Sequence, residues 1–273
     1  MKAVVLARGK GTRMRQADDR VALDAAQSTA ANAGLKAMIP FRRPFLDYVL
    51  SALADAGCDE VGLVIGPEHG VVRDYYTREH PPSRVAVSFV VQAEARGTAD
   101  AVLSAESFTG DEPFLVLNSD NYYPIDVLRL LVGTEGHALP AFRRSTLIEE
   151  SNIDPDRVRS YAMLTINGDG SLQDIIEKPD AATFARFETA TDPRDVRVSM
   201  NCWRFLPSIF TACRRVEPSP RGELELPNAV RYALRTLKER FTAIPVDAGV
   251  LDLSRREDVA EVERRLSPID PRP

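Results

Sequence analysis

The chain is poor in the residues on which thiol chemistry, redox centres and histidine-based catalysis depend. Among 273 residues it has three cysteines and three histidines. Cys58, Cys202 and Cys213 are odd in number and lack metal-ligand or redox spacing. No signal-peptide pattern precedes them, so we expect reduced thiols in a cytoplasmic protein. The histidines form no plausible triad, and no pattern supports a serine or cysteine nucleophile.

Two further absences restrict the class of partner. No apolar run approaches the roughly 20 residues that a membrane-spanning helix needs, so we expect no membrane partner. The net charge is -5, so any basic patch must be local, which suits a small anionic ligand better than nucleic acid. The hydrophobic share of 44% is that of an ordinary globular protein able to bury a substantial core.

The first half of the chain alternates buried apolar runs with helical patterns. Strands are predicted at 2–7, 60–66, 84–92 and 113–120, and helices at 45–56, 67–76, 98–108 and 124–132. Strands that alternate with helices are typical of βαβ units. We therefore expect a largely parallel sheet covered by helices on both faces.

The second half is richer in strands. These are predicted at 138–144, 161–179 and 196–205, with a hairpin turn at NGDG (167–170), and helices near 206–215, 226–240 and after Arg255. The expected fold class is therefore α/β, with a mixed, mainly parallel sheet and a β-rich second half. We expect a single domain over 1–273, divided at about residue 130, with the second half extending to about 262 and a loose tail at 263–273.

One segment does not follow this alternation of strands and helices. Residues 17–34 are rich in alanine and weakly amphipathic, which predicts an additional helix ended by Gly34. The sequence leaves open whether this helix is a surface excursion, a lid or an oligomer contact.

The loop after the first strand combines backbone freedom with positive charge. Its two glycines and three basic residues are Gly9, Gly11, Lys10, Arg13 and Arg15. Glycines allow backbone N–H groups to approach a ligand closely, and arginine can bind phosphate oxygens through two hydrogen bonds. The third glycine of a dinucleotide motif and the Gly-Lys-Ser/Thr of a P-loop are absent. The loop by itself leaves a phosphate site and a solvated turn equally open.

Polar residues also follow the later strands. Gln92, Gly97 and Thr98 come after the third strand and Asp120 after the fourth. Ligands bind beyond the carboxyl ends of open parallel sheets, so we expect these residues beside the N-terminal loop. Asp120 could hold Mg²⁺ or cap the following helix. Asp252 is isolated in an apolar run and needs a partner, which a shared metal would supply.

Two charged segments complete the set of candidates. IIEKP places Glu177 and Lys178 at a strand end, and RGELE (221–225) precedes a predicted helix. IIEKP alone is more typical of a surface charge pair than of a binding site. RGELE alone is typical of a helix start, where Glu223 and Glu225 favour the positive end of the helix dipole.

In their order along the chain, these segments resemble the sugar nucleotidyltransferases, or NDP-sugar pyrophosphorylases, especially the glucose-1-phosphate thymidylyl- and uridylyltransferases. The segments that carry the resemblance are LARGKGTRM, GLKAMIPF (34–41), QAEARGTADA (92–101), LNSDN (117–121), EKP, RGELE and VLDLSRREDV (250–259). The likeness extends from Lys2 to about Val262. It implies a Rossmann-like nucleotide-diphospho-sugar transferase fold with a sugar-binding second half.

The resemblance also implies a role for each matching position. The catalytic residues would be Arg13, Lys36 and Lys178. The nucleotide would be bound by Ala7, Gly9, Gly11, Thr12, Gln92, Gly97 and Thr98. The sugar phosphate would be bound by Tyr161, Glu177, Asn201, Arg221 and Glu223. Asp120 and Asp252 would hold Mg²⁺.

The reaction implied is attack by a sugar-1-phosphate oxygen on the α-phosphorus of an NTP, with dTTP or UTP favoured, releasing pyrophosphate. The nucleophile is already anionic, so catalysis would depend on alignment and charge neutralisation. A homo-oligomer, dimer or tetramer, is expected from the resemblance only. A non-catalytic sugar-nucleotide sensor and transfer to another phosphorylated acceptor, such as phosphocholine, are the alternatives.

The chain departs from the family pattern at several positions. Arg8 stands where alanine or glycine is usual, and the 17–34 segment is additional. Ala162 replaces a glycine against which the sugar often packs, and Asn201-Cys202-Trp203 replaces Thr-Gly-Tyr or Ala-Gly-Tyr. Most of the departures lie on the sugar side, so nucleotidyl transfer is better supported than any particular sugar.

Overall fold

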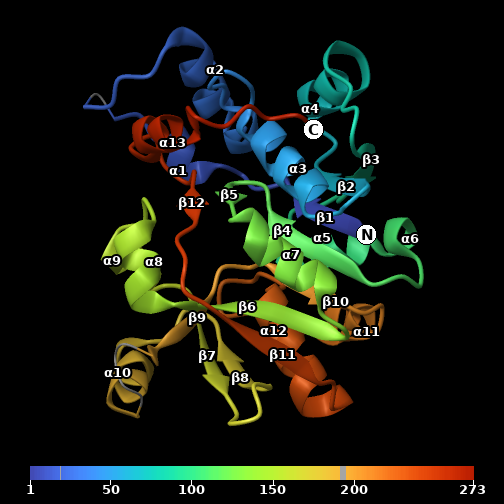
Figure 1. Ribbon diagram of the computed structural model, residues 1–273, viewed down its shortest axis with the longest axis vertical. Helices are drawn as coiled ribbons and strands as arrows, with labels where there is room; N and C mark the ends of the chain where they lie inside the picture. The colour runs from blue at the N-terminus through green and yellow to red at the C-terminus, as the bar shows by residue number, and fades with distance from the viewer. Residues whose placement is uncertain (19, 191–194) are drawn as a thin grey trace.

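The computed structural model describes residues 1–18, 20–190 and 195–273. Its strands are β1 (Lys2–Leu6), β2 (Glu60–Ile65), β3 (Ala86–Val91), β4 (Phe114–Asn118), β5 (Asn121–Tyr122), β6 (His137–Arg143), β7 (Ala162–Ile166), β8 (Leu172–Ile176), β9 (Arg197–Ser199), β10 (Trp203–Phe205), β11 (Phe241–Val246) and β12 (Leu251–Asp252). The main sheet has the order β3-β2-β1-β4-β10-β6-β9-β7-β8, with β11 also paired to β6 (Figure 1).

Helices of the first half are α1 (Thr12–Arg15), α2 (Ala25–Ala33), α3 (Phe45–Asp55), α4 (Gly70–Asp74), α5 (Thr98–Ser104), α6 (Glu106–Thr109) and α7 (Ile125–Gly133), with a 3₁₀ turn η1 (Lys36–Met38) and a π-helical turn η2 (Tyr75–Glu79). Those of the second half are α8 (Arg144–Glu150), α9 (Pro155–Val158), α10 (Ala181–Ala190), α11 (Ile209–Arg215), α12 (Leu226–Tyr232), π-helical η4 (Ala233–Leu237) and α13 (Asp258–Leu266).

The first half confirms the predicted parallel sheet. Strands β3, β2, β1 and β4 are parallel neighbours. Alternate residues of β1 enter different cores: Ala3 and Val5 pack with α3, whereas Val4 packs with α5 on the opposite face. Helices therefore cover both faces, and the carboxyl ends of these strands share one edge.

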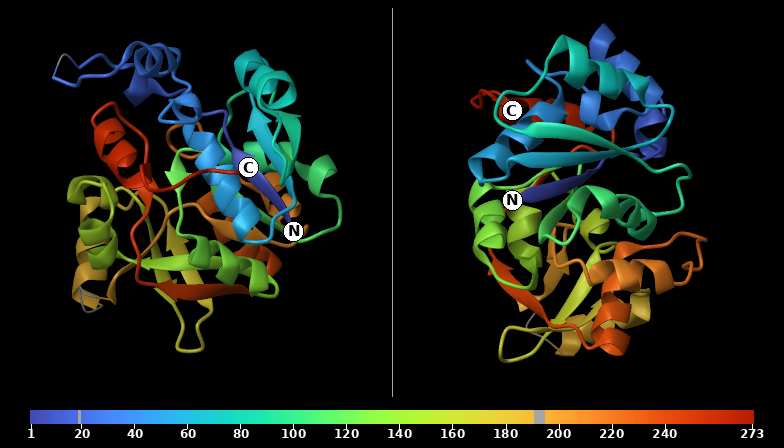
Figure 2. Two further views of the ribbon diagram at one scale, coloured as in Figure 1. Left: turned by 45° about the horizontal axis from the view of Figure 1, so that its top comes forward. Right: turned by 90° about the vertical axis from the view of Figure 1, so that its right-hand side faces the viewer.

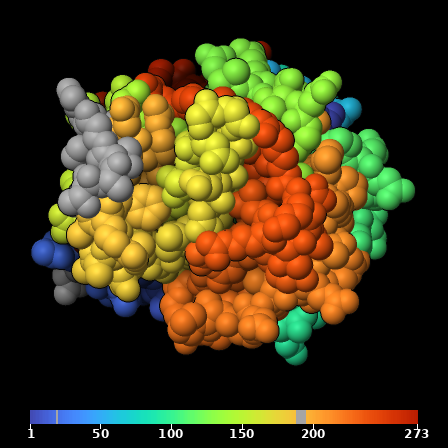
Figure 3. Space-filling view, turned by 90° about the horizontal axis from the view of Figure 1, so that it is seen from below, coloured from blue at the N-terminus to red at the C-terminus, as the bar shows by residue number. Residues whose placement is uncertain are grey.

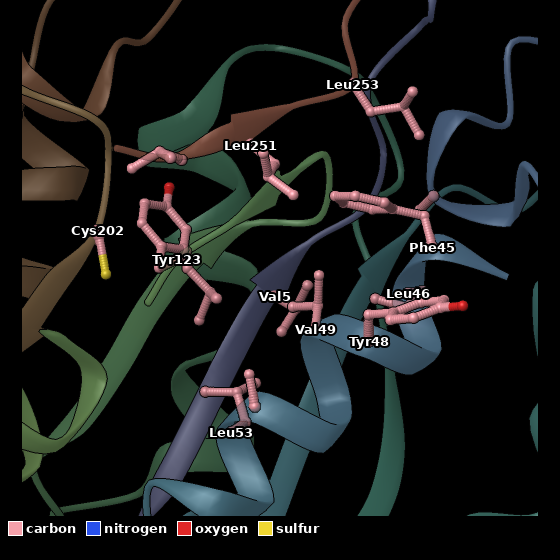
Figure 4. Close-up of a cluster of buried hydrophobic side chains, with 14 of the residues drawn as sticks. Val5, Phe45, Leu46, Tyr48, Val49, Leu53, Tyr123, Cys202, Leu251 and Leu253 are labelled. Carbon is pink, nitrogen blue, oxygen red and sulfur yellow. The ribbon is translucent and has the colours of Figure 1, made fainter. Parts of the chain in front are cut away.

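Helix α3 is held by its apolar face. Figure 4 shows Phe45, Val49 and Leu53 beside Val5 of β1, and all four side chains are buried. Each such side chain contributes about 1.5–3 kcal/mol relative to full exposure. Gly57, at a φ of 95°, follows the helix where the sequence predicts its end.

The second half is rich in strands, as expected, and its strand pairs are mainly antiparallel. The β10–β4, β10–β6, β6–β9, β9–β7 and β7–β8 pairs are antiparallel, and β11 runs parallel to β6. The NGDG turn is confirmed: the Asn167 N–H donates to the Ser171 oxygen over 2.8 Å, and Gly170 has a φ of 77°. The hairpin lies beside β11 in the view from below (Figure 3).

Several sequence predictions were wrong in extent, and the predicted 98–108 helix is divided into α5 and α6. Within the predicted 17–34 helix, residue 19 lies outside the described residues, and the described helix is Ala25–Ala33. Asp24 accepts a hydrogen bond from the Gln27 N–H and caps it, and Gly34 ends it at a φ of 73°. The strand predicted at 196–205 is two strands, broken where Asn201 takes a φ of 54°. The predicted 226–240 helix ends at Leu237, and β11 follows as a strand that the sequence analysis missed.

The C-terminal segment returns to the first half, as its red ribbon shows in Figures 1 and 2. Strand β12 pairs antiparallel with β5, and α13 follows. The tail expected to be loose is anchored, because the Ser83 and Arg84 N–H groups donate to the Pro273 oxygen over 2.8 and 3.2 Å. Across the described ranges, no helix is both long and apolar enough to span a bilayer.

Candidate active site

Two adjoining cavities open at the carboxyl edge of the parallel strands. The first, of about 440 Å³, is lined by the N-terminal loop, η1, the residues after β3 and β4, and the RGELE segment. The second, of about 710 Å³, is lined by residues of the second half and by the β5–β12 region. Tyr161 and Asp252 line the second cavity, and the other predicted site residues line the first. The structure thus brings together residues from distant parts of the chain.

The N-terminal loop depends on a close backbone contact. Gly11 has a φ of 59°, and a Cβ there would collide with the backbone oxygen of Gly34. The end of the 17–34 segment therefore supports the loop. Arg15 does not serve the cavity, because its Nη2 donates to the Ala33 oxygen at the end of α2 over 2.8 Å. Arg13 is exposed and lines both cavities.

Asp120 and Lys36, which both line the first cavity, form an ion pair. Lys36 lies in η1, and its ammonium donates to Oδ2 of Asp120, which follows β4. Their side chains are only 17% and 18% exposed. The pair joins the segment that supports the loop to the carboxyl end of the sheet. The alternative that Asp120 caps the following helix is wrong, because the N-cap of α7 is Pro124 and no side chain accepts a capping hydrogen bond there.

Asp252 lies beside Asp120 because β12 pairs with β5. The Leu253 N–H donates to the backbone oxygen of Asp120 over 2.8 Å, and Asn121 Nδ2 donates to the carboxylate Oδ2 of Asp252 over 3.1 Å. Burial, followed by the negative charge of Asp120, raises the pKa of Asp252. A cation bound here would relieve this repulsion.

Arg157 is the partner of Asp252 that the sequence analysis missed. Its guanidinium forms ion pairs with Asp252 and, over 2.7 Å, with Asp258. Asp258 in turn accepts from the Ser254 and Arg255 N–H groups over 2.8 and 2.7 Å. The sequence indicated that a buried Asp252 needs a partner, and the predicted partner was a shared metal rather than an arginine. No local pattern pointed to Arg157.

Gln92, which also lines the first cavity, has a fixed amide orientation. Its Nε2 donates to the Gly97 oxygen over 3.1 Å and to Asp100 Oδ2 over 2.8 Å. Both partners are acceptors, so the NH₂ group must face them, and Oε1 remains as the acceptor. Asp100 is held by Arg96 over 2.5 Å. Gln92 was predicted from the sequence, whereas Asp100, which sets the orientation of the Gln92 amide, was not.

The two halves of the chain meet next to Gln92. Gly97 has a φ of 128°, and a Cβ there would collide with the backbone of Leu224. The Thr98 hydroxyl accepts from the Leu226 N–H over 2.9 Å, and the Leu224 oxygen accepts from the Ala99 N–H over 2.8 Å. The RGELE segment is therefore attached directly to the residues after β3.

Charged side chains of two segments, around Glu177 and around Arg221, line the first cavity, and Glu177, Lys178 and Arg221 line the second as well. Lys178, at a φ of 44°, lies 3.7 Å from Glu177, and burial raises the pKa of Glu177 to about 7. Arg221 pairs with Glu225 and lies 3.4 Å from Glu223. Near neutral pH, Glu177 can therefore either donate or accept a hydrogen bond.

Two buried polar atoms in this region have no hydrogen-bond partner within the described part of the chain. These are the Tyr161 hydroxyl and Oδ1 of Asn201, both on residues that line the cavities. Buried polar groups are nearly always hydrogen-bonded, so both atoms are suited to contact a polyhydroxylated ligand.

The model of the nucleotidyl transferase family matches residues 2–264, almost the whole chain. This chain belongs to the nucleotidyl transferase family. The nucleotidyltransferase is 30% identical to the UTP–glucose-1-phosphate uridylyltransferase AglF of Haloferax volcanii, over 97% of this chain and 96% of that protein. It is 27% identical to a glucose-1-phosphate thymidylyltransferase of Streptomyces antibioticus, over 100% of this chain and 68% of that protein.

Solved structures confirm the fold of this nucleotidyltransferase. A UDP-glucose pyrophosphorylase complexed with UDP-glucose superposes with a TM-score of 0.72 at 18% identity, over 98% of this chain and 99% of that one. A putative glucose-1-phosphate thymidylyltransferase from Bacillus anthracis superposes with a TM-score of 0.71 at 20% identity, over 99% of this chain and 96% of that one. The Rossmann-like, mixed-sheet fold implied by the resemblance is therefore confirmed.

Proposed function

We propose that this nucleotidyltransferase transfers a nucleotidyl group from dTTP or UTP to a sugar 1-phosphate and releases pyrophosphate. The observation that carries the proposal is the convergence of the basic loop, Lys36, Lys178 and the Asp120–Asp252 pair on two adjoining cavities. Glucose 1-phosphate is the first acceptor to test, because two relatives carry it in their names.

The fixed amide of Gln92 supports the choice of base. Its Oε1 can accept from a ring N–H, which uracil and thymine present at N3. Cytosine N3 and adenine N1 are acceptors and would leave two acceptors facing each other. Polar mismatch of this kind discriminates strongly between substrates. Guanine also carries a ring N–H at N1, so GTP belongs in the test.

The phosphates would lie over the N-terminal loop. Backbone N–H groups between Gly9 and Arg13, together with the side chains of Arg13 and Lys36, would bind phosphate oxygens. Asp120 and Asp252 suit Mg²⁺, which commonly uses one or two carboxylates together with substrate phosphates. When bound, Mg²⁺ would supply charge neutralisation at the phosphates.

The sugar phosphate would enter from the second cavity. Lys178 and Arg221 would bind its phosphate, and four further side chains would contact its hydroxyls: Tyr161, Glu177, Asn201 and Glu223. An oxygen of the sugar 1-phosphate forms a bond to the α-phosphorus of the NTP. The bond from the α-phosphorus to the oxygen that it shares with the β-phosphorus breaks. The electron pair leaves with pyrophosphate. No proton moves, so the chain needs no general base, and alignment and charge neutralisation drive the reaction.

The test is pyrophosphate release from five NTPs (dTTP, UTP, CTP, GTP and ATP), each with a panel of sugar 1-phosphates and Mg²⁺. We expect release with dTTP or UTP and loss by about 100-fold or more in Asp120→Asn. Nucleotide binding without turnover on any acceptor would contradict catalysis and support the sensor. That alternative is not favoured, because the named relatives are enzymes.

A further inference from the structure

Arg8 and Gln92 follow two different strands of the parallel sheet, β1 and β3. The N–H groups of Ala7 and Gln92 donate to β2 carbonyl oxygens and extend the parallel ladders beyond β1 and β3. Continued past the last paired residues, these registers place Arg8 and Gln92 on either side of Gly66, and the Glu68 carboxylate occupies the space that a Cβ of Gly66 would fill. Arg8 and Gln92 both line the first cavity.

The guanidinium of Arg8 is buried without the acceptors that it needs. Its side chain is 11% exposed, and Nε and Nη1 have no hydrogen-bond partner in the described ranges. The nearest carboxylate oxygen, Oε1 of Glu68, is 3.7 Å from Nε, which is too far for a hydrogen bond. Glu68 is itself 59% exposed, so the attraction between the two charges is weakened by water.

The neighbouring histidine cannot supply the missing acceptor. His69 Nδ1 accepts from the Gly66 N–H over 3.3 Å, so in the neutral ring Nε2 carries the proton. That Nε2 lies 3.8 Å from Glu68. Burial lowers the pKa of His69, so the neutral ring places no second positive charge beside Arg8. A buried charged donor without an acceptor is costly, so an acceptor from a ligand would stabilise Arg8.

We propose that Arg8 is a base-recognition residue that donates to an exocyclic carbonyl oxygen of uracil or thymine. Gln92 Oε1 would accept from the adjacent ring N–H, so the two side chains would present a donor beside an acceptor. The inference deepens the proposed function and rests on it. Because a hydrogen bond from a charged donor is stronger than a neutral one, Arg8 would add to the discrimination that Gln92 provides.

The test is a binding cycle on the full-length chain. Dissociation constants are measured for UTP, 2-thio-UTP, 4-thio-UTP and tripolyphosphate, with the wild-type protein and with Arg8→Met. Each thio analogue replaces one carbonyl oxygen by sulfur, a weaker acceptor, and keeps the ring N–H. Glu68→Gln is the matched control, because it alters the same group of charges without removing the donor.

We expect the wild type to bind one thio analogue several-fold more weakly than UTP. In Arg8→Met, UTP should bind roughly 10- to 100-fold more weakly, and the preference for oxygen should disappear. Tripolyphosphate should bind both proteins equally, and Glu68→Gln should keep the preference. If Arg8→Met does not fold, Arg8→Lys is measured instead, and its UTP affinity should still fall.

Equal losses for UTP and tripolyphosphate would overturn the inference and make Arg8 a phosphate ligand. Unchanged affinity for all four compounds in a folded Arg8 variant would overturn it and leave Arg8 a structural role. Failure of the wild type to bind any nucleoside triphosphate would contradict the proposed function itself, and the inference with it.

Discussion

Replacing Arg157 by methionine should destabilise the protein strongly. Its side chain is 9% exposed and pairs with Asp252 and Asp258, whose side chains are 9% and 6% exposed. Methionine fills a similar length but carries no charge, so two buried carboxylates would lose their shared cation. Removing one partner of a buried ion pair costs about 3–5 kcal/mol, a large part of the stability of an ordinary domain.

The assay is urea unfolding of the metal-free protein at neutral pH, comparing midpoints and slopes. The matched control is Arg159→Met, because Arg159 is 62% exposed and its ion pair with Asp156 should contribute at most about 1 kcal/mol. Asp252→Asn added to Arg157→Met should recover part of the loss, since it removes one uncompensated charge.

Two results would refute this reasoning. One is a loss below about 1 kcal/mol in Arg157→Met, no larger than the loss in the control. The other is a double variant no more stable than Arg157→Met alone, since the charge on Asp252 would then not be the source of the effect.

Three further predictions concern stability. Burial lowers the pKa of His137 to about 4, so as the pH falls the unfolded chain binds the proton before the folded chain does. The free energy of unfolding should therefore fall by about 3 kcal/mol between pH 6.5 and pH 4. His137→Gln should lack this pH-dependent loss when its unfolding is measured across the same range. Gly97→Ala should lower the free energy of unfolding by about 1–3 kcal/mol or more, because Gly97 has a φ of 128° and lies against the backbone of Leu224. Gly168→Ala, with open space around it, is the control and should cost less than about 1 kcal/mol. Equal urea midpoints for the two variants would contradict this. Thr98→Val should cost about 1–3 kcal/mol in the same assay, because the Leu226 N–H loses its acceptor, and an unchanged midpoint would argue against that contact.

The sequence by itself determined the features that short-range patterns encode. Apolar runs and helical periodicity located β1 to β4 and the helices around them, and the NGDG turn located the β7–β8 hairpin. The order of the short motifs indicated the nucleotidyltransferase family, which the family match over 2–264 confirmed. The roles of individual residues remain proposals. Local patterns suffice here because strand, turn and helix preferences depend on neighbours along the chain.

The tertiary structure alone decided which side chains satisfy one another. Lys36 and Asp120 are 84 positions apart, and Arg157 and Asp252 are 95 apart, so no periodicity could pair them. The orientation of the Gln92 amide depends on Asp100 of α5, and α5 takes its position by packing on β1 and β2. Electrostatic and hydrogen-bond energies depend on distance and burial in three dimensions, and those are fixed only when the sheet has formed.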